Sequence, residues 1–119
     1  MNVLLVKPNC TPEVVEISGN LESMQSLVGG TIQAIYPFPE HIALIANDEG
    51  KMIGLPLNRA VPEIGDVICG DFFLCGAPPD SGYFASLTDE QIAHFNERFL
   101  HPETFLLLDN ETLLTLCTN

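Results

Sequence analysis

The chain has 119 residues, 46% of them hydrophobic, and sixteen Asp and Glu against four Lys and Arg give it a formal charge of −12. This composition predicts one folded domain over residues 1–119 and excludes a disordered acidic tail, which lacks the apolar residues needed to offset chain entropy. Because the four basic residues are scattered, a basic patch is excluded and we expect no direct binding to nucleic acid.

The first part of the chain predicts strands around one short helix. Apolar or alternating runs predict strands at Val3–Val6, Glu13–Ile17, Thr31–Tyr36 and His41–Ala46. A helix of about two turns is expected between Asn20 as N-cap and Gly29-Gly30 as terminator. Its inner face is predicted to hold Leu21, Met24, Leu27 and Val28.

The middle of the chain predicts a hairpin and a long apolar segment. The turn residues Asn47–Gly50 predict a hairpin whose return strand covers Met52–Leu57, with Pro56 at an edge or a bulge. Asp66–Gly76 is then expected to form either one strand kinked at Gly70 or two strands joined there. A Pro-rich loop follows.

The second helix has the clearest start signal in the sequence. Thr88 and Gln91 form a capping box, and Leu87 and Ile92 form a hydrophobic staple. The helix is expected to end at His101-Pro102.

The last residues allow two interpretations. Phe105–Leu108 and Leu113–Cys117 form either two strands about a turn at Asp109-Asn110, or a strand and a helical turn. The fold class predicted from all these elements is α+β, a mainly antiparallel sheet with two short helices packed on one side.

The acidic residues concentrate in the second half of the chain. From residue 61 onward Arg98 is the only basic residue, so the field of this half attracts basic surfaces. The predicted partner-binding residues are Glu63, Asp66, Asp71, Asp80, Asp89, Glu90, Glu97, Glu103, Asp109 and Glu111.

One stripe of the second helix resembles a metal site. Glu90, His94, Glu97 and His101 are spaced by four, three and four residues, and carboxylates with imidazoles bind transition metals. The alternative is a solvated face stabilised by Glu–His pairs one turn apart. Because one helix seldom directs four ligands at a single ion, we expect no metal and no cofactor.

The cysteines and the amino terminus bear on location. The apolar run Val3–Val6 is accompanied by neither a basic leader nor a small-residue cleavage site, so it is not expected to be a signal peptide. No other apolar run approaches the roughly 20 residues of a membrane span. We therefore expect a soluble protein of the bacterial cytoplasm. Its cysteines, Cys10, Cys69, Cys75 and Cys117, are then expected to be reduced, with Cys69 and Cys75 as core thiols. An extracellular disulfide pair is the alternative.

A second candidate site follows the predicted hairpin. Lys51, Asn58 and Arg59 are expected to hold a phosphate or carboxylate if they converge, with Tyr36 stacking on a base. Phe38 and Tyr83 are further stacking candidates. The alternative is that Arg59 pairs with one of the protein's own carboxylates and Asn58 caps a turn.

Several blocks of the sequence resemble an uncharacterised family. They are LESMQSLVGG at 21–30, IYPF at 35–38, NDEGK at 47–51, GLPLNRA at 54–60, ICGDFF at 68–73 and LTDEQ at 87–91. In this order they resemble domain of unknown function 3846, a family of small proteins encoded by gut Firmicutes, their phages and their conjugative elements. The resemblance covers nearly the whole chain and supplies no catalytic residue. It implies that the protein is encoded on a mobile element, where antirestriction and other counter-defence genes are common.

Three functions follow from these observations, and none of them is enzymatic. The first is a phage or mobile-element accessory protein, an anti-CRISPR or antirestriction inhibitor whose acidic surface mimics nucleic acid toward a basic nucleic-acid-binding protein or defence complex. The second is a binder that sequesters a nucleotide signal. The third is a structural interaction domain that uses Tyr36–Pro39 and Pro78–Phe84 as a homodimer or partner surface.

Overall fold

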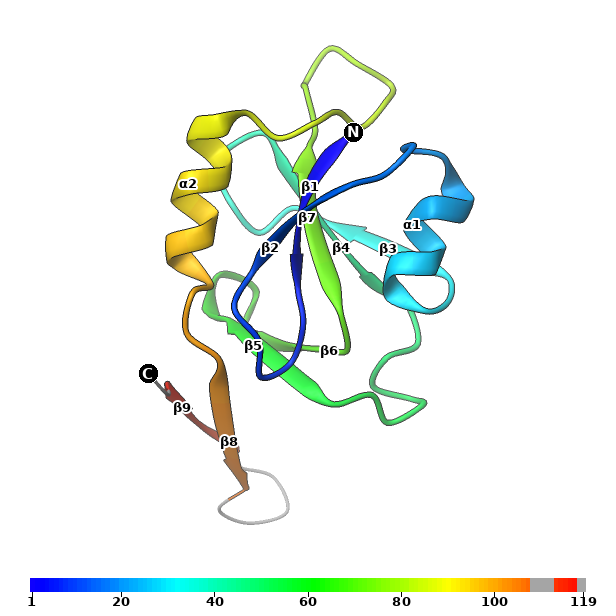
Figure 1. The fold of residues 1–119 in the computed structure, drawn as a ribbon. Coiled ribbons are helices and arrows are strands. Elements are labelled where there is room, and N and C mark those ends of the chain that lie inside the picture. Colours follow the sequence, from blue (N-terminus) through cyan, green and yellow to red (C-terminus); the bar gives the residue numbers. More distant parts are fainter. Residues whose placement is uncertain (108–112, 118–119) are drawn as a thin grey trace.

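The computed structural model describes residues 1–107 and 113–117 (Figure 1). In chain order the elements are β1 (Asn2–Val6), β2 (Glu13–Glu16), α1 (Leu21–Val28), β3 (Ile32–Ile35), β4 (Ile42–Asn47), β5 (Leu57–Val61), the 3-10 turn η1 (Pro62–Ile64), β6 (Asp66–Cys69), β7 (Phe72–Gly76), α2 (Asp89–Arg98), β8 (Glu103–Leu107) and β9 (Leu113–Cys117). The main sheet is antiparallel with strand order β2-β1-β7-β4-β3, and β5 pairs with β6 and β8 with β9. The predicted α+β class with a mainly antiparallel sheet is confirmed.

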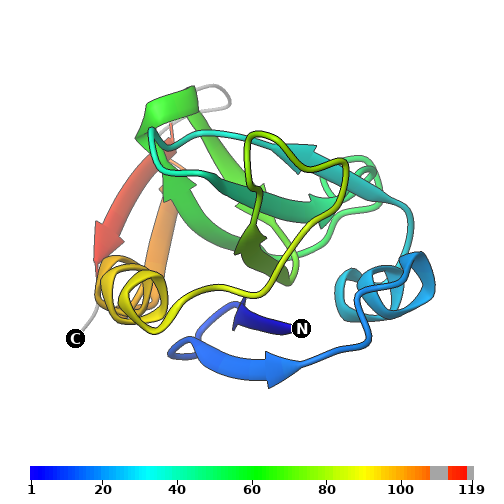
Figure 2. The same ribbon diagram turned by 90° about the horizontal axis from the view of Figure 1, so that it is seen from above.

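The central strands of the main sheet are buried on both faces. In β7, Leu74 faces the core under α2, whereas its neighbours Phe73 and Cys75 face the core under α1. Leu4 of β1 and Leu44 of β4 lie in register with Leu74 and extend the same row across the sheet. Because both faces are apolar, each needs a cover, and the helices lie on opposite faces (Figures 1 and 2). The prediction that both helices pack on one side is wrong.

Helix α1 begins and ends as its sequence predicts. The Asn20 side chain accepts a hydrogen bond from the backbone N–H of Ser23 at 2.8 Å, and Gly29, with φ of 75°, terminates the helix. Met24 and Val28 are buried, whereas Leu21 of the predicted inner face is 55% exposed. The helix therefore covers the sheet with a narrower apolar stripe than expected.

Helix α2 has the predicted capping box. The Thr88 hydroxyl accepts from the Gln91 N–H at 3.1 Å, and the Gln91 side chain accepts from the Thr88 N–H at 2.9 Å. Leu87 is buried and Ile92 packs against the same core, as expected of a staple. The helix ends at Arg98, slightly before the predicted His101.

The predicted return strand over Met52–Leu57 is wrong. Residues 48–54 form consecutive turns, and the next strand, β5, begins only at Leu57 and pairs with β6. Gly54 has a φ of +74°, which is incompatible with an extended strand, and Pro56 has no N–H for a ladder. The segment therefore leaves the main sheet after β4.

The chain passes between sheets at Gly70. Of the two predicted interpretations of Asp66–Gly76, two strands joined at Gly70 is correct, since β6 pairs with β5 and β7 enters the main sheet. Gly70 has a φ of +82°, and a Cβ there would lie 2.6 Å from Cδ1 of Leu55.

The two-strand interpretation also holds for the C-terminal segment, as β8 and β9. The predicted Asp109-Asn110 turn lies outside the described residues.

Candidate interaction surfaces

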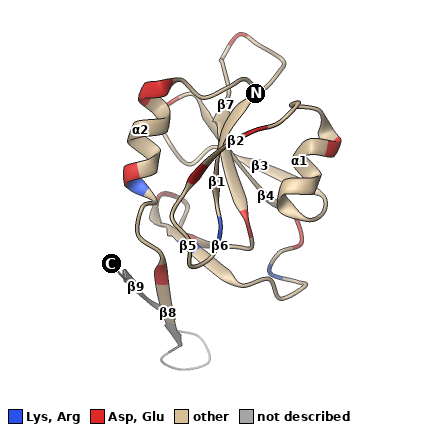
Figure 3. Cartoon of the chain, in the orientation of Figure 1, with Lys and Arg blue, Asp and Glu red and all other residues tan. Residues whose placement is uncertain are grey.

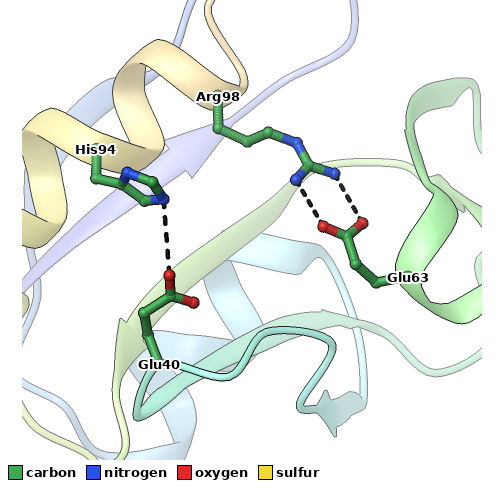
Figure 4. A network of polar contacts seen from close by, with 4 residues as sticks. All are labelled: Glu40, Glu63, His94 and Arg98. Carbon is green, nitrogen blue, oxygen red and sulfur yellow. Dashed lines mark hydrogen bonds and ion pairs between the residues drawn. The ribbon is translucent and has the colours of Figure 1, made fainter.

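The basic side chains of the surface are occupied by carboxylates of the protein itself. Among the described residues, the ion pairs of Lys and Arg are Lys7 with Glu13, Lys51 with Asp66 and Arg98 with Glu63. The last pair is bidentate, with N–O distances of 2.6 and 2.8 Å (Figure 4). The guanidinium also lies over the Phe38 and Phe99 rings. The hydrogen bond from Arg98 lowers the pKa of Glu63, and partial burial opposes it only in part.

The fourth basic residue, Arg59, is 1% exposed. Its Nη2 donates to the carbonyl oxygens of Cys10 at 2.6 Å and Phe99 at 3.0 Å, and its Nη1 donates to Oδ1 of Asn58 at 2.9 Å. The charge of Arg59 also acts on the carboxyl of Glu103. A guanidinium inside the protein is stable only when its donors are satisfied in this way.

Asn58 reaches the interior because of a β-bulge. The register of β5 against β6 shifts between Leu57 and Arg59, which leaves Asn58 as the extra residue. Its Nδ2 donates to the carbonyl oxygens of Val6 at 2.9 Å and Gly70 at 2.8 Å. Asn58 and Arg59 therefore join β1, β5, β6 and the end of α2.

The four residues predicted for ligand binding do not form one site. Asn58 and Arg59 are buried and hydrogen-bonded to the backbone, so they do not present a phosphate-binding surface. Lys51 is exposed and paired with Asp66, and Tyr36 lines a different hollow. The geometry contradicts the convergence that a nucleotide binder required. The alternative is that Arg59 pairs with a carboxylate and that Asn58 caps a turn. In the structure Arg59 donates to the carbonyl oxygens of Cys10 and Phe99 and to Asn58, and its charge acts on the carboxyl of Glu103. Asn58 instead donates to the carbonyl oxygens of Val6 and Gly70.

Sequence reasoning missed the burial of Arg59, although one signal was present. Arg59 lies two residues before Val61 on β5, so in a regular strand the two side chains share a face, and Val61 is fully buried. The carbonyl acceptors that satisfy Arg59 come from distant segments and leave no mark in the sequence.

The acidic residues predicted to bind a partner fall into groups of different character. Asp80, Asp89, Glu90 and Glu97 are exposed. Glu63 and Asp66 are neutralised by Arg98 and Lys51, and Asp109 and Glu111 lie outside the described residues. Acidic positions occur on α1, α2, β2, β8 and several loops, rather than on one face (Figure 3).

Two further acids of the predicted set are partly buried. Burial raises the pKa of Asp71, against the effect of Lys7, and it raises the pKa of Glu103. The Glu103 carboxylate also accepts from the backbone N–H of Ala60 at 3.1 Å, which attaches β8 to β5. This residue therefore has a structural contact of its own.

In the predicted metal stripe on α2, the His94 side chain faces a carboxylate from another segment. Nε2 of His94 lies 3.8 Å from Oε1 of Glu40, which precedes β4 (Figure 4). Within residues 1–107 and 113–117, no group of three or more His, Cys, Asp or Glu side chains is arranged to hold a metal ion.

The predicted core thiols are buried. Cys69 and Cys75 are both free cysteines of the core, and Cys10 is a free cysteine at the surface. Burial raises the pKa of the Cys75 thiol to about 12. This thiol is therefore not an activated nucleophile.

Two loop segments predicted as partner surfaces come together in space. Tyr36, from the first, and Pro78, Pro79, Tyr83 and Phe84, from the second, line one hollow of about 340 Å³. A neighbouring hollow of about 350 Å³ shares Tyr83 and Phe84 and extends toward α1. The loop between β7 and α2 thus presents Tyr83 and Phe84 to both hollows and its two prolines to the first.

Among the described parts of the chain, neither helix is long and apolar enough to cross a bilayer. Searches of curated proteins and of solved structures found no match to this chain. The model of one family, described as Domain of unknown function (DUF3846), matches residues 1–100. These residues include the main sheet, both helices and the β5–β6 pair, and they end before β8. The chain belongs to the DUF3846 family.

Proposed function

We propose that this protein is a counter-defence inhibitor carried by a phage or mobile element, of the anti-CRISPR or antirestriction type. It acts in the cytoplasm of the bacterial host by contact and without catalysis. Its anionic surface occupies the cleft of a basic nucleic-acid-binding protein in place of phosphate. The mobile-element context is what the family resemblance implies.

The observation that carries the proposal is that the four Lys and Arg side chains are all engaged within the protein itself. Each of the three exposed ones is paired with one of the protein's own carboxylates, and Arg59 is buried. The exposed carboxylates Asp80, Asp89, Glu90 and Glu97 are then left to face a partner. A basic cleft therefore meets carboxylates rather than a mixture of charges, and like-charge repulsion is small.

Helix α2 provides the most compact group of these carboxylates. Asp89 and Glu90 lie in its first turn and Glu97 near its end, and all three are exposed. We define Asp89, Glu90 and Glu97 as the α2 acidic group and propose it as the centre of the contact. Because a rigid helix fixes their spacing, the group presents charge at a defined separation, as a nucleic-acid backbone does.

The test begins with capture of partners from a host lysate on tagged protein at about 0.1 M salt, where attraction between charges reaches roughly 10 Å. The captured nuclease or effector is purified, and both binding and inhibition of its nuclease activity are measured. Neutralising the α2 acidic group as Asp89→Asn, Glu90→Gln and Glu97→Gln should weaken binding about tenfold, from three contacts of about 0.5 kcal/mol each.

The matched control removes the same number of charges elsewhere, as Glu16→Gln, Glu22→Gln and Glu49→Gln, all at exposed positions. This variant should bind within about threefold of the parent, since only the long-range field changes. Capture of no basic nucleic-acid-binding protein would overturn the proposal. Equal loss in both triple variants would overturn the assignment to α2.

A further inference from the structure

All the tyrosines of this protein are gathered at one hollow. The chain has two Tyr and no Trp, and Tyr36 and Tyr83 line the same hollow although they are far apart in sequence. Tyr36 is 62% exposed and Tyr83 is 85% exposed, beside the consecutive prolines Pro78 and Pro79. Large aromatic side chains left in water beside prolines form an amphipathic surface suited to contact.

The loop that carries Tyr83 is fixed at its base. Gly76 and Ala85 exchange two backbone hydrogen bonds of 2.7 and 2.9 Å, and the Ser86 hydroxyl accepts from the N–H of Asn2 at 2.9 Å. Within the loop, the Ser81 hydroxyl bonds the backbone of Tyr83 in both directions. A loop held in this way presents its side chains with little further ordering cost on binding.

Charge defines the ligand more narrowly. Among the described residues that line the hollow there is no Lys or Arg, and Asp80 is exposed between Pro79 and Ser81 of the same loop. The three exposed cations of the chain are paired elsewhere and the fourth is buried. A ligand with Arg or Lys is therefore favoured over a neutral or acidic one.

We propose that this hollow binds a proline-rich segment of a protein partner, in polyproline II conformation, with Arg or Lys next to its prolines. Aromatic-lined grooves bind such segments because the extended helix is already ordered and its proline rings pack against aromatic rings. This peptide site goes beyond the proposed function, because it uses residues outside the α2 acidic group and needs no defence protein.

The tyrosine content provides a direct measurement. A synthetic peptide without aromatic residues, APRPPAPRPA, is titrated into the purified protein at about 0.1 M salt, where charges still attract. Because Tyr36 and Tyr83 are the only source of tyrosine fluorescence and Trp is absent, a saturable change reports this hollow. Calorimetry gives the affinity independently.

Three variants locate the site. Tyr83→Ala and Tyr36→Ala should each weaken binding about tenfold through lost aromatic packing. Met52→Ala removes another exposed side chain, 87% accessible, which lines a different hollow, and should leave the affinity unchanged. Because all three residues are exposed, the variants should fold, and their melting curves check this.

Several results would overturn the proposal. One is the absence of saturable fluorescence and heat with the parent protein. A second is equal affinity for APEPPAPEPA, because charge selects the ligand in the proposal. A third is self-association in sedimentation that Tyr83→Ala abolishes, because a second copy would then occupy the hollow. The α2 triple variant should keep peptide affinity within about twofold, so the two proposals fail separately.

Discussion

The two faces of the main sheet are stabilised in different ways. Under α1 the core is largely aliphatic and is closed by a short helix that buries Met24 and Val28. Under α2 it contains the aromatic cluster of Phe38, Phe72, Phe95 and Phe99, together with the polar pair Asn58 and Arg59. The face under α1 is held mainly by apolar packing, with one buried side-chain hydrogen bond from Nδ2 of Asn47 to the carbonyl oxygen of Val28. The face under α2 is also held by several hydrogen bonds from Asn58 and Arg59 to distant segments.

The largest expected effect on stability comes from removing Arg59, whose hydrogen bonds join distant segments. Arg59→Ala leaves the carbonyls of Cys10 and Phe99 without this donor and opens a cavity. The free energy of unfolding should fall by at least about 3 kcal/mol, measured by urea denaturation. The control is Arg98→Ala, whose partly exposed pair with Glu63 should cost about 1 kcal/mol or less. Equal losses would contradict the comparison.

A somewhat smaller effect is expected under α1. Met24→Ala removes a buried side chain of the apolar core under α1, and should cost about 2–3 kcal/mol through lost burial and a cavity. Leu21→Ala, on the exposed side of the same helix, should change stability by only about 0.5 kcal/mol. If Leu21→Ala proved as costly as Met24→Ala, the assignment of the inner face would be wrong.

Removing either helix N-cap should lower the free energy of unfolding by about 1 kcal/mol. Asn20→Ala and Thr88→Ala both remove an N-cap acceptor. Because α1 is held by two buried side chains, Asn20→Ala should increase hydrogen exchange mainly within α1. Thr88→Ala should act on the whole protein, since the residue after α2, Phe99, binds Arg59. Increased exchange confined to α2 in the Thr88→Ala variant would show that the hydrogen bonds of Arg59 do not couple the stability of α2 to that of the rest of the protein.

The smallest effect at neutral pH concerns Cys75. Burial raises the pKa of its thiol from the ordinary value of 9.0 to about 12. Above pH 9 the unfolded chain loses this proton while the folded protein keeps it, so stability should fall as pH rises from 9 to 12. The Cys75→Ala variant should show a shallower decrease over this range in denaturation curves. An equal slope would assign the decrease to other groups.

The sequence predicts local structure better than it predicts packing. The capping box at Thr88 and Gln91 and the terminator Gly29 are local signals, and both helices lie where these signals place them. The faces of the helices could not be predicted, because β1 and β4 are apolar on both sides and their alternation carries no preference. The return strand over Met52–Leu57 failed because an apolar run with glycine reads equally well as a strand or a turn.

The candidate surfaces divide in the same way. Tyr36–Pro39 and Pro78–Phe84 could each be recognised as exposed aromatic segments, but their meeting in one hollow depends on the tertiary fold. The acidic residues could be counted, whereas the ion pairs that neutralise Glu63 and Asp66 join residues far apart in the chain. Ion pairs between residues so far apart in the chain can be recognised only in the folded structure.

The position of β7 has a consequence for synthesis. This strand is the last of the five in chain order, yet it lies between β1 and β4 at the centre of the main sheet. During translation, β1 and β4 leave the ribosome with no central partner, and their apolar edges stay open until residue 76 emerges. Pairing across such long separations is slow, and open edges invite association with other chains. The nascent protein is therefore most vulnerable to aggregation just before β7 arrives.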